Sequence, residues 1–144
     1  MPIQSYKMGP GTLTLGAGGD LLDVSCQMTN FRVEPAESVK STDPIPVLCG
    51  EELPAEDSAT LAYRIKGTLL QDLAAAGVAA WTWEHAGEEQ AFTFTPNTAL
   101  AASVTGMARV VPIVIGGDVD KTKRPTSDVD WACVGADPAF TPGA

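Results

Sequence analysis

Short segments in which apolar and polar residues alternate recur along this chain, and they constrain its fold more than any other feature. The clearest is residues 60–70, where Ile65 and Leu69 share one face while Arg64 and Lys66 share the other. Alternation of period two is typical of a half-buried β-strand, because successive side chains point to opposite faces. Fourteen Gly and eleven Pro, which favour turns and interrupt helices, are spread through the 144 residues. The sequence therefore predicts a mainly β protein.

Six further strands are predicted from similar patterns, at residues 11–16, 24–33, 81–83, 90–95, 104–115 and 128–134. In the second of these, the apolar set changes parity between Met28 and Phe31, so we expect a β-bulge at Thr29 and Asn30. An Ala-rich segment predicts one short α-helix at residues 72–80. We expect a single domain over residues 1–144, because this is a common domain length and no repeat or boundary interrupts it.

Residues 34–58 interrupt the strand pattern. They contain four prolines and seven acidic residues around a short apolar piece at residues 45–49. This length exceeds an ordinary hairpin loop, and loops so long are usually functional or ordered by a partner. A plain surface excursion is the alternative interpretation. Residues 1–10 and 135–144 are rich in turn-forming residues and are predicted to be an N-terminal and a C-terminal arm.

The net charge of −9 and the isoelectric point near 4.3 argue against a protein that grips nucleic acid. Such a protein neutralises phosphates with Lys and Arg, whereas an acidic surface repels DNA. Plain solubility is the simpler interpretation of the same charge. The first residues are not followed by the continuous apolar stretch of a signal peptide, and no apolar segment approaches the ~20 residues of a membrane span. We therefore expect a soluble protein made in the cytosol.

Residues that could support catalysis or bind a metal are few and scattered. The sequence DVDKT at residues 118–122 resembles the DxDxT motif of haloacid-dehalogenase-like phosphotransferases, in which the first Asp is the nucleophile and the second is the acid/base. However, the 22 residues after it cannot hold the rest of that fold. The single histidine, His85, is expected in an exposed polar turn. Cys26, Cys49 and Cys133 lie in strand-like runs and are expected to be buried. No catalytic, cofactor or metal site is predicted, and we expect that the chain is not an enzyme.

The order of elements resembles that of the tail tube (major tail) proteins of long-tailed, siphovirus-type bacteriophages. The resemblance covers nearly the whole chain and begins with a single short helix after a strand, residues 69–80, followed by Trp81. It continues with the strand end FTFTP at residues 92–96. The closing segment, residues 127–138, also fits, with an aromatic residue in the last strand and a Gly-x-x-Pro exit.

This resemblance implies a β-sandwich or half-barrel of the phage tail tube type. Its subunits would form hexameric rings that stack into the tube of the virion, a conduit for DNA ejection into the host. Implied partners are further copies of the chain, the tape measure and other tail proteins, and phage DNA that passes without sequence-specific contacts. Synthesis in the host cytoplasm, without membrane insertion, is implied as well. Closure through neighbouring copies would cover strand edges that otherwise aggregate.

By the same resemblance, the segments between and beyond the strands are the assembly elements. They are the N-terminal arm 1–10, the long assembly loop 34–58 and the C-terminal arm 135–144. Within them the assembly interface is assigned to Tyr6, Pro35, Pro44, Ile45, Pro46, Val47, Leu48, Pro138 and Phe140. Acidic residues on outward strand faces are the candidates for a lumen wall that repels DNA.

Two alternatives to a tail tube stay open at this point. One is a small monomeric β-barrel or sandwich that binds a ligand or glycan, which would need a concave apolar pocket with a few convergent polar groups. The other is a different virion protein, such as a head-decorating or connector protein. Light scattering separates the monomeric binding module from both virion proteins, and ring symmetry separates the virion proteins from each other.

Overall fold

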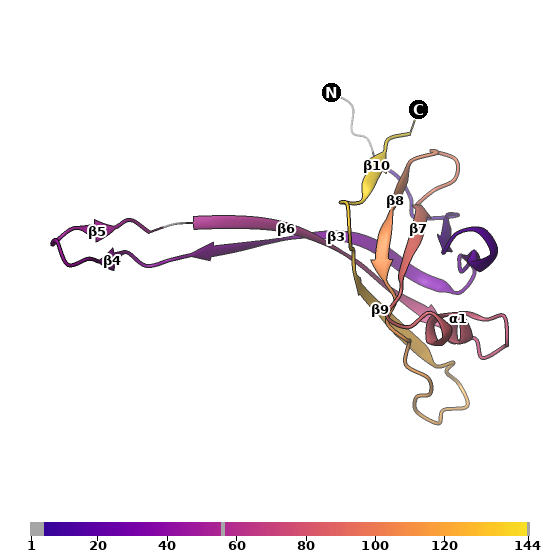
Figure 1. Ribbon diagram of the computed structural model, residues 1–144. Helices are drawn as coiled ribbons and strands as arrows, with labels where there is room; N and C mark the ends of the chain where they lie inside the picture. Colours follow the sequence, from indigo (N-terminus) through magenta and orange to yellow (C-terminus); the bar gives the residue numbers. More distant parts are fainter. Residues whose placement is uncertain (1–4, 56, 144) are drawn as a thin grey trace.

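The computed structural model describes residues 5–55 and 57–143 and shows antiparallel strands, one short α-helix and a projecting hairpin (Figure 1). The strands are β1 (Thr12–Leu15), β2 (Leu22–Asp23), β3 (Met28–Ser41), β4 (Ile45–Pro46), β5 (Glu52–Leu53), β6 (Asp57–Leu70), β7 (Glu89–Thr95), β8 (Ser103–Arg109), β9 (Thr126–Ala132) and β10 (Ala139–Thr141). Helix α1 spans Val78–Glu84, and a 3-10 turn spans Gly18–Asp20. The prediction of a mainly β protein with one short helix is confirmed.

The two larger sheets form the body of the protein. One contains five strands in the order β10-β8-β7-β1-β2, and the other contains three in the order β3-β6-β9. They are joined along one side, where Ala108 of β8 bridges Cys133 and the Val134 N–H donates to the Met107 carbonyl at 2.9 Å. On the opposite side, β2 and β3 are the edge strands of their sheets. The body is therefore a pair of sheets that is open along one side.

The hydrophobic core combines side chains from both larger sheets. Phe31 of β3 and Phe94 of β7 meet edge to face, with their ring centroids 4.6 Å apart. Further core side chains come from the strands, from α1 and from the segments after β2 and β8: Leu13, Leu15, Val24, Ile65, Leu69, Val78, Ala79, Trp81, Phe92, Ala108, Val110, Ile113, Val129 and Trp131. Burying each large apolar side chain contributes about 1.5–3 kcal/mol to the stability of the fold, and this burial is the main force that holds the sheets together.

Two details of register agree with the sequence prediction. The pairing of β3 with β6 shifts register between Met28 and Asn30, which confirms the expected bulge. On β9, Val129 and Trp131 are buried and Asp130 is exposed, as the alternation predicts. Both predictions depend on the fixed period of two in a strand. A single inserted residue moves every later side chain to the opposite face.

The helix was predicted at residues 72–80, but it begins at Val78 and ends at Glu84. Asp72 does not start it, because its Oδ1 accepts a hydrogen bond from the Ala74 N–H at 3.0 Å and forms an Asx turn. Gly77 is the N-cap residue, and a Cβ on it would lie 2.7 Å from the carboxyl carbon of Asp72. The Ala-rich segment before Gly77 is therefore a turn that delivers the chain to the helix.

The predicted strand at residues 81–83 is wrong, because both tryptophans lie in α1. Trp81 is buried in the core, whereas Trp83 is half exposed and its Nε1–H donates to the Ile113 carbonyl at 3.0 Å. Side chains two residues apart share a face in a strand but point in different directions from a helix. A pattern of only three residues could not by itself distinguish the two structures.

Two predicted strands are shorter at one end. The first, 104–115, leaves the sheet after Arg109, and residues 110–115 cross over α1, where the Ile113 N–H donates to Thr82 Oγ1 at 3.3 Å. Pairing stops here because the partner strand β7 begins at Glu89, and Pro112 has no N–H with which to extend a ladder. The predicted strand 24–33 likewise starts only at Met28, because the preceding residues form a turn.

The predictions for cysteine and histidine burial are wrong in most cases. Cys26 and Cys49 are exposed because both lie in turns, and Cys133, just after β9, is partly buried. Partial burial raises the pKa of the Cys133 thiol. His85 directly follows α1 and is buried, with Nδ1 2.6 Å from Glu88 Oε2, instead of exposed.

The two predicted terminal arms are held against the body where the structure describes them. The Gly9 N–H donates to the Pro96 carbonyl at 2.9 Å, next to the end of β7; residues 1–4 of the predicted arm lie outside the described residues. Within the predicted C-terminal arm, Phe140 of β10 pairs with Val104 of β8. Backbone pairing with the sheet satisfies groups that composition alone assigned to a loop.

Candidate assembly interface

A long β-hairpin projects from the body, and its residues 35–63 are named the hairpin arm (Figure 1). The register of β3 and β6 continues to the pair Ser41↔Asp57, whereas that of β6 and β9 ends at Arg64↔Ala132. Beyond Arg64 the arm is a two-stranded ribbon that ends in the short pair of β4 and β5. The predicted irregular loop at residues 34–58 is therefore corrected to a hairpin.

The prolines that suggested a loop are compatible with the hairpin. Pro35 lies inside β3, which is the edge strand of its sheet, and a proline is tolerated there because its missing N–H need not break a ladder. At the far end, Val47 N–H donates to the Glu51 carbonyl and Gly50 N–H to the Val47 carbonyl, both at 3.0 Å. Gly50 has φ of +90°, which favours glycine at this turn.

One face of the arm continues the core-facing side of the body. Directly paired residues on antiparallel strands share a face, so the Val33↔Ile65 pair in the body fixes the faces of the stem. The same face carries the pairs Pro35↔Tyr63, Glu37↔Leu61 and Val39↔Ala59. The opposite face carries small residues: Ala36, Ala62, Ser38 and Thr60, with the two hydroxyl oxygens 3.1 Å apart. The first face therefore carries the larger side chains of the arm, and its apolar residues Val39 and Leu61 are exposed.

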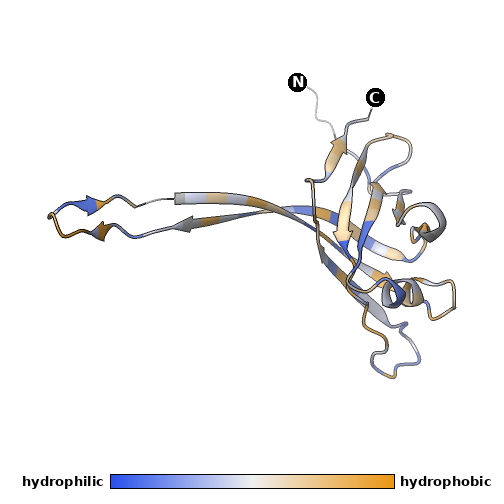
Figure 2. Ribbon diagram, in the orientation of Figure 1, coloured by the Kyte–Doolittle hydropathy of each residue, from blue (hydrophilic) through white to orange (hydrophobic). Residues whose placement is uncertain are grey.

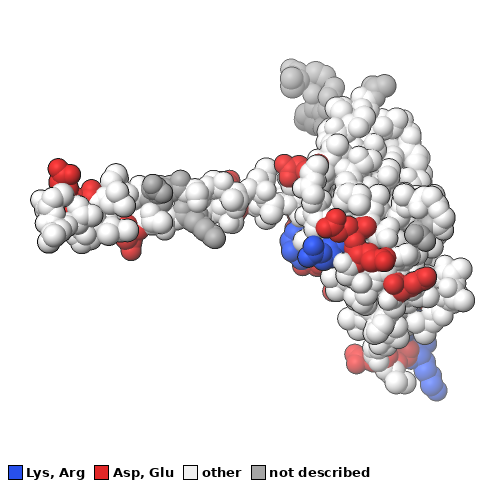
Figure 3. Space-filling model, viewed as in Figure 1, with Lys and Arg blue, Asp and Glu red and all other residues white. Residues whose placement is uncertain are grey.

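The end of the arm, residues 43–53, is named the arm tip and combines apolar with acidic side chains. Its exposed large apolar residues are Ile45, Val47, Leu48 and Leu53, and the side chain of Leu48 is fully exposed. Asp43, Glu51 and Glu52 are exposed among them. Figure 2 shows the apolar residues at the tip, and Figure 3 shows acidic side chains at the same end of the molecule.

The arm has the physical properties of a surface that is covered by another molecule. An isolated two-stranded ribbon is marginally stable in water, and exposed strand edges pair readily with other chains. In the described residues, both edges of the two-stranded part are unpaired beyond Tyr63. Burying the exposed apolar side chains of the stem and tip would contribute on the order of 10 kcal/mol before the cost of association.

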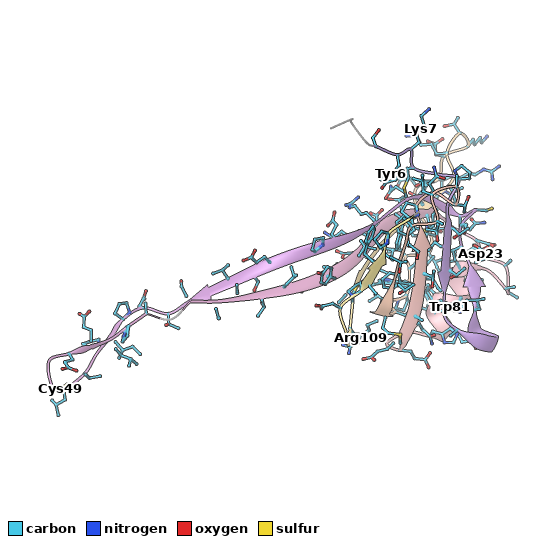
Figure 4. The ribbon with its side chains drawn as sticks, turned by 90° about the horizontal axis from the view of Figure 1, so that it is seen from above. Tyr6, Lys7, Asp23, Cys49, Trp81 and Arg109 are labelled. Carbon is cyan, nitrogen blue, oxygen red and sulfur yellow. The ribbon has the colours of Figure 1, made fainter. Side chains whose placement is uncertain are left out.

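The structure places most of the sequence-predicted interface residues on the arm, but not all. Pro35 lies in the stem, and the other arm residues cluster at the tip: Pro44, Ile45, Pro46, Val47 and Leu48. Tyr6 and Phe140 are exposed on the body, and Pro138 is half-buried beside β10. Figure 4 shows Tyr6 far from the arm tip, which Cys49 marks. The predicted residues therefore do not form one continuous surface on a single copy.

Sequence reasoning missed three exposed apolar residues of the arm: Val39, Leu53 and Leu61. Leu61 lies on the same face of β6 as the core residue Ile65, but that face has no cover so far from the body. The alternation over residues 60–70 was the available signal for Leu61, whereas residues 34–41 show no regular alternation that would mark Val39. The register that pairs these two stretches is set only by the folded hairpin.

A second feature is an open apolar groove on the body, named the seam groove, with a volume of about 390 Å³. It lies where β1 faces the first residues of β3, on the open side of the two sheets. Its lining is uncharged and consists of Met8, Gly9, Pro10, Gly11, Thr12, Leu13, Ser25, Cys26, Met28, Thr29, Asn30, Phe31, Phe94 and Pro96. The Asp23 carboxylate borders this lining, because its Oδ1 accepts hydrogen bonds from the Ser25 N–H at 3.0 Å and from the Ser25 hydroxyl.

The outer face of the three-stranded sheet carries paired charges. Arg64 Nε–H donates to Asp130 Oδ1 at 2.6 Å, and Lys66 Nζ lies 3.1 Å from Glu34 Oε2, which also pairs with Arg32. The hydrogen bond from Arg64 lowers the pKa of Asp130, and the hydrogen bonds from Lys66 and Arg32 lower the pKa of Glu34. The lumen hypothesis expects an acidic face. This face instead carries both positive and negative side chains, which pair with each other.

We expect the NMR titration midpoint of Asp130 to lie below the ordinary aspartate value and to rise toward it in Arg64→Met. Because the pKa of Asp130 is lowered in the folded state, the pair stabilises the fold at a pH above the ordinary carboxyl pKa. This stabilisation is lost as the pH falls and Asp130 becomes protonated. The matched control is Arg109→Met, which removes the separate pair with Glu89 and should leave the Asp130 midpoint unchanged. A midpoint that does not respond to Arg64→Met would contradict this assignment.

The DVDKT string of residues 118–122 contains a hydrogen-bonded turn. Asp120, the second acid of the DVDKT string, accepts hydrogen bonds from the N–H and Oγ1–H of Thr122 at 2.8 and 2.7 Å, in a local turn. These bonds lower the pKa of Asp120. Within residues 5–55 and 57–143, no group of three His, Cys, Asp or Glu side chains is placed to hold a metal ion. In the same part of the chain, no helix is both long and apolar enough to cross a membrane.

Comparison with known proteins adds no relative to this picture. No protein-family model matches the chain. A search of curated proteins gives no match either. The interpretation of the arm therefore depends on its own geometry, burial and charge.

Proposed function

We propose that this chain is a structural virion protein, a tail tube subunit of a siphovirus-type bacteriophage, and not an enzyme. Copies assemble into hexameric rings of the tail tube fold, and the rings stack into a tube through which DNA is ejected into the host. The resemblance in element order motivates the family. The observation that supports self-assembly is the hairpin arm, whose apolar face and strand edges are uncovered in a single copy.

The charge distribution also supports a conduit rather than a nucleic-acid-binding protein. The chain carries a net charge of −9, and the cations of the outer sheet face are paired with carboxylates. Paired cations are less available to phosphates, and the excess of acidic groups repels a passing polyanion. Tape measure and other tail proteins are the proposed further partners, with the host cytoplasm as the place of assembly.

Purified protein at high concentration should form rings and tubes in negative-stain electron microscopy, with scattered light rising above a threshold concentration. The threshold is expected because burial of the arm must offset the loss of translational freedom. Six-fold rings would agree with a tube protein, and other ring symmetry would favour a head-decorating or connector protein. A chain that stays monomeric at every concentration and salt condition would sink the proposal.

The seam groove favours one alternative, a monomeric module that binds an apolar ligand. Its volume of about 390 Å³ lies in the range of roughly 300–1,000 Å³ that binding pockets have. Polar groups that converge on a ligand are scarce, because the Ser25 hydroxyl is engaged with Asp23 Oδ1 at 2.5 Å. This alternative leaves the arm unexplained, and light scattering at high concentration tests it directly.

A further inference from the structure

The arm leaves the body where the sheet narrows from three strands to two, and this place is named the arm root. The chain just after β9 still pairs with β6 here, because the Cys133 N–H donates to the Tyr63 carbonyl at 2.9 Å. On the core-facing side, Ile65 is completely buried whereas Leu61 is about half exposed, so packing against the core ends at the same level. Beyond the arm root the two strands form a ribbon, which twists more easily than a wider sheet.

A cluster of charged side chains lies on the outer face of the sheet, directly at the arm root. It joins all three strands and consists of Arg32 and Glu34 of β3, Arg64 and Lys66 of β6, and Asp130 of β9. Just beyond it, the outer face of the arm carries small residues at the pairs Ala36↔Ala62 and Ser38↔Thr60. The charged groups are therefore concentrated where the arm and the body join.

The ion pairs between the strands of this cluster run diagonally. Glu34 is directly opposite Arg64 in the register, yet its Oε2 lies 3.1 Å from Nζ of Lys66, which is farther along β6. Arg64 reaches past its register partner Ala132 to Asp130, where Nε–H donates to Oδ1 at 2.6 Å and Nη2–H to the carbonyl at 3.1 Å. Ladder hydrogen bonds run perpendicular to the strands, so diagonal contacts add resistance to sliding and twisting of one strand against the next.

We propose that this charged cluster is a brace that sets the direction in which the arm leaves the body. Arg64 ties β6 to β9, and Glu34 ties β3 to β6 through Lys66, so both strands of the arm are fixed at the arm root. The same hydrogen bonds lower the pKa of Glu34 and of Asp130, so both carboxylates are charged at neutral pH. The brace acts within a single copy. This inference therefore goes beyond the proposed assembly and is tested on the monomer.

The direction at the arm root matters because the arm is long. With a rise of about 3.3 Å per residue, the arm tip lies roughly 40 Å from the arm root, so a tilt of about 10° displaces the tip by about 7 Å. The brace thereby decides which points on another molecule the apolar tip can reach. Arg64 and Glu34 are positioning residues in this account, since they act through the strands that carry the tip.

The native cysteines allow the direction of the arm to be measured. Cys49 marks the arm tip and Cys26 lines the seam groove on the body, and both are exposed. In a Cys133→Ser parent, both thiols are spin-labelled, and pulsed electron paramagnetic resonance gives the distribution of distances between the labels at a concentration where the protein is monomeric. We expect one narrow distribution in the parent. Arg64→Met and Glu34→Gln should each broaden it by about 1.5-fold, because the ribbon can then twist at the arm root.

Arg109→Met is the matched control, because it removes an exposed ion pair with Glu89 on the other large sheet. It should leave the distribution unchanged. Urea unfolding of the same variants should show little change in stability, since exposed ion pairs contribute little to it. Broadening without loss of stability distinguishes a brace from a general loosening of the fold.

Three results would overturn the brace. They are a broad distribution already in the parent, equal widths in the parent and in both Arg64→Met and Glu34→Gln, and equal broadening by Arg109→Met. Failure of the wild-type protein to assemble would overturn the proposed function instead and leave the brace standing. Narrow distances in the parent that broaden only in the two brace variants support the inference, whatever the state of assembly.

Salt gives a second measurement that needs no further substitution. Exposed ion pairs are screened at high ionic strength, so about 1 M NaCl should broaden the distribution of the Cys133→Ser parent toward that of Arg64→Met. The same salt should leave the already broad distribution of Arg64→Met unchanged. A parent distribution whose width does not depend on salt would contradict an ionic brace.

Discussion

Deleting residues 40–54 should abolish rings and tubes while the body stays folded. The deletion removes the arm tip and joins Val39 to Ala55, and residues 55–58 then connect Val39 to its register partner Ala59. A connection of this length is common in hairpins, so the stem can still pair. Because the removed part touches little of the core, the free energy of unfolding should change by no more than about 1 kcal/mol.

Negative-stain microscopy and urea unfolding, measured on the same preparation, check this expectation. Ser38→Ala is the matched control, since it changes the opposite, small-residue face of the stem and should assemble normally. Normal tubes from the deletion variant would show that the arm tip is not an assembly element. An unfolded deletion variant would show that the arm stabilises its own body, contrary to the exposure of its side chains.

Ile65→Ala should destabilise the monomer, whereas Leu61→Ala should impair only assembly, although the two residues lie on one face of β6. Ile65 is completely buried in the core, whereas Leu61 is about half exposed on the arm. Ile65→Ala should lower the free energy of unfolding by about 2–5 kcal/mol, because it leaves a cavity. This is a large part of the roughly 5–15 kcal/mol that holds a domain folded. Leu61→Ala should change the stability of the monomer by less than about 0.5 kcal/mol.

The same pair separates folding from assembly. At concentrations below the assembly threshold, urea titration followed by tryptophan fluorescence measures the monomer alone. Light scattering measures assembly. If the Leu61 side chain is buried between copies, Leu61→Ala should raise the threshold concentration for assembly by about tenfold. Equal losses of monomer stability for Ile65→Ala and Leu61→Ala would mean that the arm is covered by its own chain in solution. The proposed interface would then be wrong.

Much of the fold follows from local pattern. The strands at residues 12–15, 89–95 and 126–132 lie close to their predicted positions, and the bulge after Met28 is where a change of parity required it. These features depend on the alternation of side chains in a strand, which acts between neighbours in the sequence. Elements decided by competing local contacts were placed less well. The turn at Asp72 and Ala74 delays the helix, which then includes both Trp81 and Trp83.

By itself, the sequence determined that the chain is mainly β with one short helix, which faces of its strands are apolar, and that residues 34–58 differ from the rest. It did not determine that this segment is an extended hairpin, because pairing between β3 and β6 joins residues far apart in the chain. Tertiary structure alone decided that Leu61 is exposed while Ile65 is buried, and that Cys26 lines a groove. Periodicity fixes the direction of a side chain, whereas burial depends on what the folded chain places opposite it.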